Sequence, residues 1–487
     1  MSRRASLFSI FGALLALLVA LHLPYLSLPF HWDEMGQFVP AALDLYRDGA
    51  WVPQSTLPNV HPPALMAYLA VVWRIAGFSI PAARLAMLLI ASAGVYVSFL
   101  LAIRLGRESI GAPAIASTLF LIVSPVFYTQ SMLVLLDMPA MTLTVLALYL
   151  FLRERYGWCA VASTVLVLTK ETAITTPLVF AAWLWFAEGR RRTALYFAAP
   201  MLAMAAWLAV LYRGTGHFLG NDEFVAFNVR QAIAPLHIVS AILHHLWTLF
   251  GADGKFLGSV ALYAGWKALR GRSWNVALWV AGAQVAVVTL FGGALLDRYL
   301  LPVLPIVLIG MAVAASAYTA HWRWASHFMM VVLLVCGWFW YPPYPFPLEN
   351  NLSMVDFVRL QKSAAGYLER NAAGKRIASV WPFTDAIRRP EFGYVQRALT
   401  PVPLRGLGPS GLAGANPRDY DLLVVYSRSW AVERSVGGMP FVRALLRRYL
   451  YYEPEAMSGE IREISGLAPI ARWELGTQWI VVYGPPE

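Results

Sequence analysis

The chain has 487 residues, of which 59% are hydrophobic and only 13% are charged. A soluble protein usually carries about 25% charged residues, so this composition indicates a membrane protein. The formal net charge is +11, but the arginines lie in small groups between apolar runs. That distribution is typical of membrane topology and excludes nucleic-acid binding as the reason for the charge.

Apolar runs separated by short polar breaks predict about eleven transmembrane helices in the first part of the chain. Arg3 and Arg4 precede the first run and place the N-terminus on the cytoplasmic side, as an uncleaved anchor. Every short connection with two or more arginines then falls on that same side. The expected spans are residues 7–29, 81–103, 111–126, 138–152, 158–169, 172–187, 194–212, 254–269, 275–293, 299–318 and 325–341.

The three longest connections on the outer face in this threading are residues 30–80, 127–137 and 213–253. Two stretches within them, 35–47 and 236–250, have one polar and one apolar helical face, which predicts amphipathic helices lying on the outer membrane surface. The second contains His244 and His245, which are candidates for binding a metal.

An aromatic and proline-rich stretch, Trp338–Pro347, marks the end of the membrane domain, which we expect to comprise residues 1–345. Residues 346–487 are more polar and predict a small α/β domain outside the membrane. A helix fits residues 353–371. Short β-branched runs predict strands at Arg376–Val380, Asp421–Tyr426 and Trp479–Tyr483. The fold class is therefore mainly α, a polytopic membrane protein with a small C-terminal α/β domain.

An acidic pair, Asp33 and Glu34, follows directly after the first apolar run. The positive end of the helix expected at 35–47 would keep both carboxylates ionised, which is the state that a general base needs. The alternative is a solvated acidic loop without a catalytic role.

Further ionisable groups fall on the same face, and their convergence is a stronger indication of a site than any one pair. Each has a structural alternative: a solvated histidine, a helix cap, a polar helix end or an internal ion pair. Arg298 lies on the side that the positive-inside bias disfavours, which indicates a specific anionic partner. The set comprises His61, Asp137, Lys170 with Glu171, Asp222 with Glu223, and Asp297 with Arg298 and Tyr299.

The order of these motifs resembles that of a known family. An acidic pair in the first outer loop is followed by His-Pro-Pro at 61–63, Asp-Met-Pro at 137–139, Lys-Glu at 170–171 and Asp-Arg-Tyr-Leu-Leu-Pro at 297–302. This series resembles the GT-C glycosyltransferases, specifically the protein mannosyltransferase and aminoarabinose transferase group, over roughly residues 1–340. The resemblance implies transfer of a sugar from a polyprenyl-phosphate donor to an acceptor hydroxyl, outside the cytoplasmic membrane.

The resemblance also implies roles for individual residues. Asp33 is expected to be the catalytic carboxylate, with Glu34 and Asp137 in the same cavity, and Lys170 and Arg298 to bind phosphate. Glu171, His61 and Tyr299 complete the expected substrate-binding set. The phosphate already activates the donor, so no cofactor is required. A divalent metal stays open, with Glu34, Asp137 and His61 as its candidate ligands.

One displacement with Asp33 as general base would invert the anomeric centre. Expected partners are the lipid donor, membrane lipids, and a glycan, lipid or protein hydroxyl as acceptor, with no nucleic acid. Two alternatives stand beside the transferase: a membrane glycan ligase or polymerase, and a lipid or glycolipid transporter. A transporter usually places charges near the midplane and shows internal repeats, whereas here the charges gather at one face. The C-terminal domain either binds acceptor or caps the site.

Overall fold

The structure is a computed structural model that describes residues 3–107, 111–230, 232–340, 348–427, 439–450 and 456–486. Contacts divide the chain into two compact units. Unit 1 comprises Met1–Leu26 and Gln37–Trp338, and unit 2 comprises Ser27–Gly36 and Phe339–Glu487. The sequence did not indicate that Ser27–Gly36, which contains the acidic pair, is grouped with the C-terminal residues.

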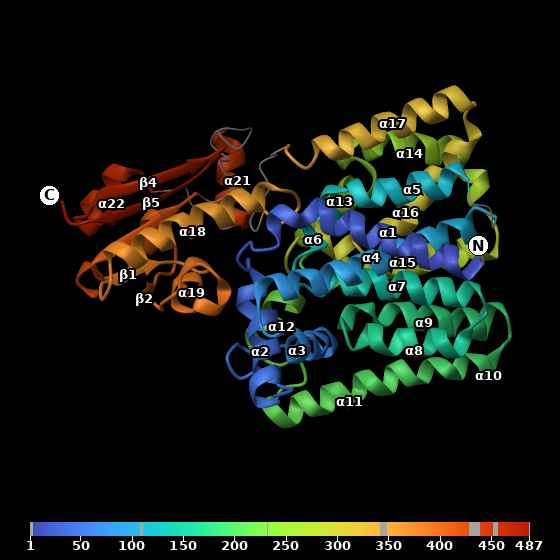
Figure 1. Ribbon diagram of the computed structural model, residues 1–487, viewed down its shortest axis with the longest axis horizontal. Coiled ribbons are helices and arrows are strands. Elements are labelled where there is room, and N and C mark those ends of the chain that lie inside the picture. The colour runs from blue at the N-terminus through green and yellow to red at the C-terminus, as the bar shows by residue number, and fades with distance from the viewer. Residues whose placement is uncertain are drawn as a thin grey trace. The chain divides into compact units, whose positions relative to one another are not determined.

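Unit 1 is a bundle of helices (Figure 1). A helix coincides with at least half of each predicted span. These helices are α1 (Arg3–His22), α4 (Ile80–Leu105), α5 (Ala112–Val123), α7 (Asp137–Leu152), α8 (Tyr156–Val167), α9 (Thr175–Ala182), α11 (Ala198–Thr215), α14 (Lys255–Gly265), α15 (Arg272–Leu290), α16 (Leu304–Ala314) and α17 (Ala320–Cys336). The helices α1, α4, α7, α8 and α11 form a row in which each packs on the next.

Three helical segments among the described residues are long and apolar enough to cross a membrane: Ile80–Leu105, Arg191–Thr215 and Arg272–Leu290. A bent pair, Asp222–Arg230 with Pro235–Phe250, makes a fourth if both parts belong to one span. Other apolar helices, such as Asp137–Leu152, are only 10–17 residues long. The structure therefore supports a membrane protein, and the count of about eleven spans stays a prediction.

The two helices predicted to lie on the outer surface differ from each other. In α2 (Val39–Asp48) the whole stretch from Val39 to Leu45 is buried, and α2 packs against an apolar helix that we did not predict, α3 (Ala64–Ala76). The prediction of a surface helix is thus wrong for α2. In α13 (Pro235–Phe250), Leu246 and Trp247 are 52% and 59% exposed, whereas His245 and Thr248 point inward and are buried. The polar face of α13 therefore faces the protein.

Unit 2 is an α/β fold around one five-stranded sheet in the order β2-β1-β3-β5-β4. Strand β1 pairs in parallel with β2 and β3, and β5 pairs antiparallel with β3 and β4. The strands are β1 (Arg376–Ser379), β2 (Thr400–Pro403), β3 (Leu422–Tyr426), β4 (Ala468–Leu475) and β5 (Gln478–Gly484). The helices are α18 (Ser353–Asn371), α19 (Phe383–Arg388), α20 (Pro409–Ala413), α21 (Pro440–Leu450) and α22 (Ser458–Ser465).

The predicted helix at 353–371 is confirmed as α18, which packs against β4 and β5 (Figure 1). The three predicted strands are confirmed as β1, β3 and β5. Strands β2 and β4 were not predicted. The sequence of β2 is Thr-Pro-Val-Pro, and its prolines are compatible with a strand only because β2 lies at an edge of the sheet.

Candidate active site

A buried cluster of opposite charges lies in unit 1 at the start of α7. The Lys170 ammonium group donates a hydrogen bond to the Asp137 carboxylate, and Arg298 Nε lies 3.6 Å from the other carboxylate oxygen of Asp137. All three side chains are almost completely buried. Three residues that are far apart in the sequence therefore meet in one place. The alternative of an isolated helix cap at Asp137 does not describe this arrangement.

The cluster brings the two positive charges of Lys170 and Arg298 together in a buried setting beside the carboxylate of Asp137. The ring of Tyr299 lies 4.5 Å from Lys170 Nζ and 5.6 Å from Arg298 Cζ, so its π-face offsets part of that charge. Lysine and arginine side chains are typical binders of phosphate groups, so the pair has the chemistry of a phosphate site.

Local structure explains how the two cations reach Asp137. Lys170 precedes a single helical turn, Glu171–Ile174, and is extended there, so the chain bends between α8 and α9 at this residue. Arg298 lies in the turn Asp297–Leu300. Its neighbour Asp297 accepts a hydrogen bond from Thr248 Oγ1 at 2.8 Å and lies 2.7 Å from His244 Nε2. These contacts fix the turn against α13 while Arg298 approaches Asp137.

The residues His244 and Thr248 were not predicted as part of this site. The polar helical face of residues 236–250 could have indicated them, but we interpreted that face as facing water. The suggestion of a metal held by His244 and His245 is not supported, because the two rings have different partners: Asp297 for His244 and Thr289 Oγ1, at 3.0 Å, for His245.

A second ion pair lies next to the cluster in sequence. His61 Nδ1 is 2.9 Å from Glu171 Oε2, and the His61 backbone N–H donates to the Asn59 side chain at 3.0 Å. Burial raises the pKa of the Glu171 carboxyl. The charge and hydrogen bond of His61, with Lys170, lower that pKa by more, so the balance is below its ordinary value. His61 and Glu171 are thus brought together, as a pair beside Lys170.

The His61–Glu171 pair predicts a pH-dependent contribution to stability. A carboxyl whose pKa is lowered in the folded protein stabilises the fold at pH values above its pKa in the unfolded chain. This stabilisation is lost as the pH falls through the lowered pKa of the folded state. We expect Glu171→Gln to reduce the unfolding free energy by about 1–3 kcal/mol at pH 7, and the difference from wild type to shrink below about pH 4. Thermal unfolding of the variant and of wild type, at pH 7 and below about pH 4, measures this difference in stability.

The matched control for that experiment is Glu154→Gln, because Glu154 pairs with Arg190 at 3.4 Å but its side chain is 52% exposed. A solvent-exposed pair contributes little to stability, so this variant should follow wild type at both pH values. Equal behaviour of the Glu171 and Glu154 variants would contradict the stabilising role of the His61 pair.

The acidic pair Asp33–Glu34 belongs to unit 2, in a tight turn. The Glu34 carboxylate accepts a hydrogen bond from the His31 backbone N–H at 2.8 Å, and the Glu34 N–H donates to the His31 carbonyl at 3.0 Å. Between them Trp32 has a φ of 49°, in the left-handed region that is uncommon for such a residue. Glu34 is fully buried and Asp33 half-buried. The Glu34 carboxylate therefore closes the turn that carries Asp33.

The candidate metal ligands do not form one cluster. Among the described residues, no group of three or more His, Cys, Asp or Glu side chains could hold a metal ion. Asp137 is bracketed by Lys170 and Arg298, and His61 is paired with Glu171. Two cations beside the Asp137 carboxylate oppose a divalent ion there. The donor set thus does not fit a metal at Asp137.

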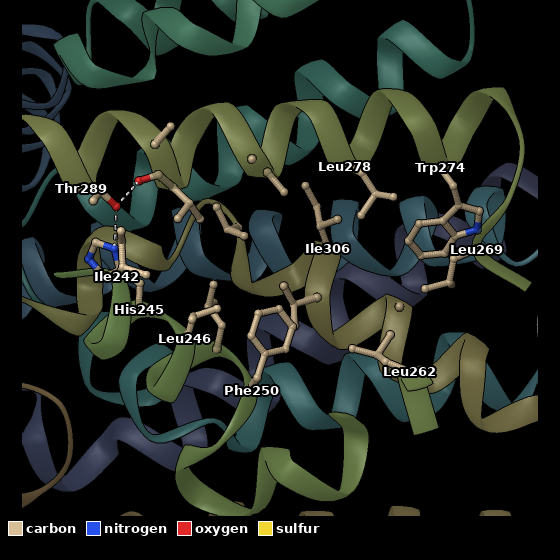
Figure 2. A pocket seen from close by; sticks show the side chains of 18 of the residues that line it. Ile242, His245, Leu246, Phe250, Leu262, Leu269, Trp274, Leu278, Thr289 and Ile306 are labelled. Carbon is tan, nitrogen blue, oxygen red and sulfur yellow. Dashed lines mark hydrogen bonds between the residues drawn. The ribbon is translucent and has the colours of Figure 1, made fainter. Parts of the chain in front are cut away.

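An apolar cavity of about 610 Å³ lies in unit 1 between α13, α14, α15 and α16. Figure 2 shows Leu269 and Trp274 at one end and the hydrogen-bonded pair His245–Thr289 at the other. His245 follows His244, which contacts Asp297. The polar end of the cavity is therefore connected through α13 to the turn that carries Arg298.

Comparison with solved structures shows that the chain shares its fold with two solved proteins, and the sequence resemblance predicted a fold of this kind. The chain is similar to ArnT from Cupriavidus metallidurans bound to undecaprenyl phosphate, with a TM-score of 0.56 and 16% identity over 96% of this chain and 97% of that one. It is also similar to the oligosaccharyltransferase AglB from Archaeoglobus fulgidus in complex with an inhibitory peptide and a dolichol-phosphate. Here the TM-score is 0.52, with 11% identity over 87% of this chain and 69% of that one. No protein-family model and no curated protein matches the chain.

Proposed function

We propose that this protein is a glycosyltransferase that moves a sugar from a polyprenyl-phosphate donor to an acceptor hydroxyl. The observation that carries the proposal is the buried cluster of two cationic side chains, Lys170 and Arg298, which is connected through α13 to an apolar cavity. A polyprenyl-phosphate sugar combines a long apolar chain with one phosphate, which are the two chemical features that these sites would bind. ArnT and AglB, whose fold this chain shares, were solved with undecaprenyl phosphate and a dolichol-phosphate, respectively.

The cavity would hold part of the polyprenyl chain, in contact with apolar side chains such as Ile242, Phe250 and Ile306 (Figure 2). Its volume is typical of a ligand pocket, and the remainder of the chain would lie among membrane lipids. With the chain in the cavity, the phosphate lies toward the His245–Thr289 end and the turn of Arg298. Lys170 and Arg298 would then neutralise the charge that develops on the phosphate as it leaves.

Asp33 is the proposed general base. Its carboxylate would accept the proton of the acceptor hydroxyl while that oxygen attacks the anomeric carbon from the face opposite the phosphate. The sugar–phosphate bond breaks as the new glycosidic bond forms, the electron pair goes to the phosphate, and one displacement inverts the anomeric centre. Glu34 supports this step indirectly, since its carboxylate binds the backbone of the turn.

The proposal includes the location and the substrate classes. The protein would lie in the cytoplasmic membrane with its N-terminus in the cytoplasm and unit 2 outside, because the arginine-rich connections fall on one side. The sugar is a hexose or pentose, and the acceptor hydroxyl belongs to a glycan, lipid or protein of the cell envelope. The donor carries its own leaving group, so the chemistry requires no cofactor.

Filling the cavity tests where the lipid binds. Gly282 on α15 lines the cavity, and a Cβ added there meets nothing within 4 Å. We expect Gly282→Phe to place its ring in the cavity and to raise the Kd for undecaprenyl phosphate about 10- to 100-fold, the loss of one well-buried apolar contact. Binding of undecaprenyl phosphate to the purified protein measures the effect, and undecaprenol, which lacks the phosphate, should bind more weakly than the phosphate.

The matched control is Gly12→Phe on α1, since a Cβ at Gly12 also meets nothing within 4 Å and Gly12 does not line the cavity. This variant should bind undecaprenyl phosphate as wild type does. Unchanged affinity in Gly282→Phe would remove the cavity from the proposal, and equal affinity for undecaprenol would remove the phosphate site.

A further inference from the structure

The topology of unit 2 creates a ligand-binding edge of the kind found in open α/β sheets. Strand β1 is parallel to β2 on one side and to β3 on the other. After β1 the chain forms β2 on one side of β1 and then crosses to form β3 on the other side. The direction in which strands are added therefore reverses between β1 and β3. The crevice outside the carboxyl ends of such strands is where α/β folds bind ligands. Here these ends are followed by Val380 and Trp381 after β1 and by Ser427 after β3.

Trp381, at this edge, is in contact with the chain's own segment Ser27–Gly36. The rings of Trp32 and Trp381 form a T-shaped contact at a centroid distance of 4.5 Å. A Cβ added to Gly36 would lie 3.0 Å from Trp381 Cζ2, so the backbone also approaches Trp381 closely. The Tyr426 hydroxyl at the end of β3 donates to the Trp381 carbonyl at 3.1 Å and holds that residue in place. The segment thus lies where a separate ligand would otherwise bind.

Hydrogen bonds to Phe30 also fix the same segment. The Phe30 backbone N–H donates to the Phe392 carbonyl at 3.1 Å, and the Tyr394 hydroxyl donates to the Phe30 carbonyl at 2.9 Å. Phe30, Phe392 and Tyr394 are all buried. Both backbone polar groups of Phe30 are thereby bound by unit 2, three residues before Asp33.

We infer that unit 2 is a positioning scaffold for Asp33, and that Tyr394 and Trp381 are its positioning residues. The left-handed Trp32 is an unfavourable conformation that persists only where the surroundings determine it, and the contacts to Trp381 and Tyr394 provide such surroundings. The inference rests on the proposed function, in which Asp33 is the general base. It also assigns the ligand-binding edge of the sheet to the enzyme's own loop, and not to the acceptor.

Positioning has a kinetic signature that differs from binding. A small displacement of a catalytic group costs rate, because the reacting atoms leave the near-attack geometry. We expect Tyr394→Phe and Trp381→Leu each to lower kcat for an undecaprenyl-phosphate-linked sugar about 10- to 100-fold. The KM for this donor and the Kd for undecaprenyl phosphate should stay unchanged, because neither residue belongs to the cavity or to the cation cluster. Hydrogen exchange of the backbone amides in residues 28–36 should become faster in both variants.

Tyr483→Phe is the matched control. Tyr483 is as buried as Tyr394, and its hydroxyl pairs with Ser458 Oγ at 3.2 Å on another part of the sheet. It should leave kcat and the exchange of residues 28–36 at wild-type values. If Tyr394→Phe behaves as Tyr483→Phe does in both measurements, the scaffold inference is wrong. Should Trp381→Leu fail to fold, the Tyr394 result alone decides.

The two levels of the account fail separately in this experiment. If Asp33→Asn is inactive while Tyr394→Phe matches its control, the proposed function stands and the scaffold inference falls. If Asp33→Asn keeps wild-type activity, Asp33 is not the base, whatever the Tyr394 variant does. Faster exchange of residues 28–36 with unchanged kcat would show that unit 2 holds the loop but that catalysis does not depend on it, which also overturns the inference.

Discussion

Replacing Asp33 by Asn is expected to lower kcat for sugar transfer by about 10²–10⁴-fold, the contribution typical of a general base. Asn has nearly the same shape as Asp but cannot take the proton of the acceptor hydroxyl. Insertion of the protein and binding of undecaprenyl phosphate should persist, because the cavity and the cation cluster belong to unit 1. Release of lipid phosphate from an undecaprenyl-phosphate-linked sugar, measured at saturating donor, gives kcat.

Asp48→Asn controls for the loss of a negative charge nearby in the sequence, since Asp48 is exposed at the end of α2. This variant should transfer sugar at the wild-type rate. Undiminished transfer by Asp33→Asn would remove Asp33 from the base role and would leave the acidic pair with the structural interpretation alone.

Lys170→Met is expected to have the second large effect, a loss of about 10²–10³-fold in kcat, as when one stabilising group is removed from a developing oxyanion. The KM for the donor should rise as well, because Lys170 would also contact the phosphate in the ground state. The variant should be less stable by about 3–5 kcal/mol, since it leaves the buried Asp137 carboxylate with only one cation. Lys170→Arg keeps the charge and should recover part of the activity.

Lys255→Met separates this effect from instability. Lys255 is also a buried lysine, and its ammonium group lies 2.9 Å from Asp253. Its removal should lower the melting temperature while the KM and kcat per folded molecule stay at wild-type values. If both lysine variants lose activity only in proportion to their loss of folded protein, Lys170 is a structural residue and the phosphate site must be sought elsewhere.

The sequence predicted the parts of the structure that follow local periodicity. Long apolar runs coincide with helices, and α18 has the bounds expected for it. The threading also placed Asp137, Lys170 and Arg298 on one face, and the structure joins them in one cluster. This succeeded because the positive-inside bias constrains every connection at once.

Features that depend on contacts between distant residues were not predictable. The bond between Tyr394 and Phe30 joins residues 364 positions apart, and nothing in the spacing of either segment indicates it. The pairing of Asp297 with α13 was missed because the polar face of that helix was interpreted as facing water, whereas the helix turns this face to the protein. Such orientation depends on the surroundings of the helix and not on its own pattern.

The most direct measurement follows a labelled sugar on undecaprenyl phosphate, added to the purified protein in lipid vesicles together with cell-envelope acceptor material. We expect release of undecaprenyl phosphate in step with the appearance of the label in the acceptor, through a glycosidic bond of inverted anomeric configuration. Recovery of the intact labelled lipid from the opposite leaflet, with no release of lipid phosphate, would contradict glycosyl transfer and would identify a transporter.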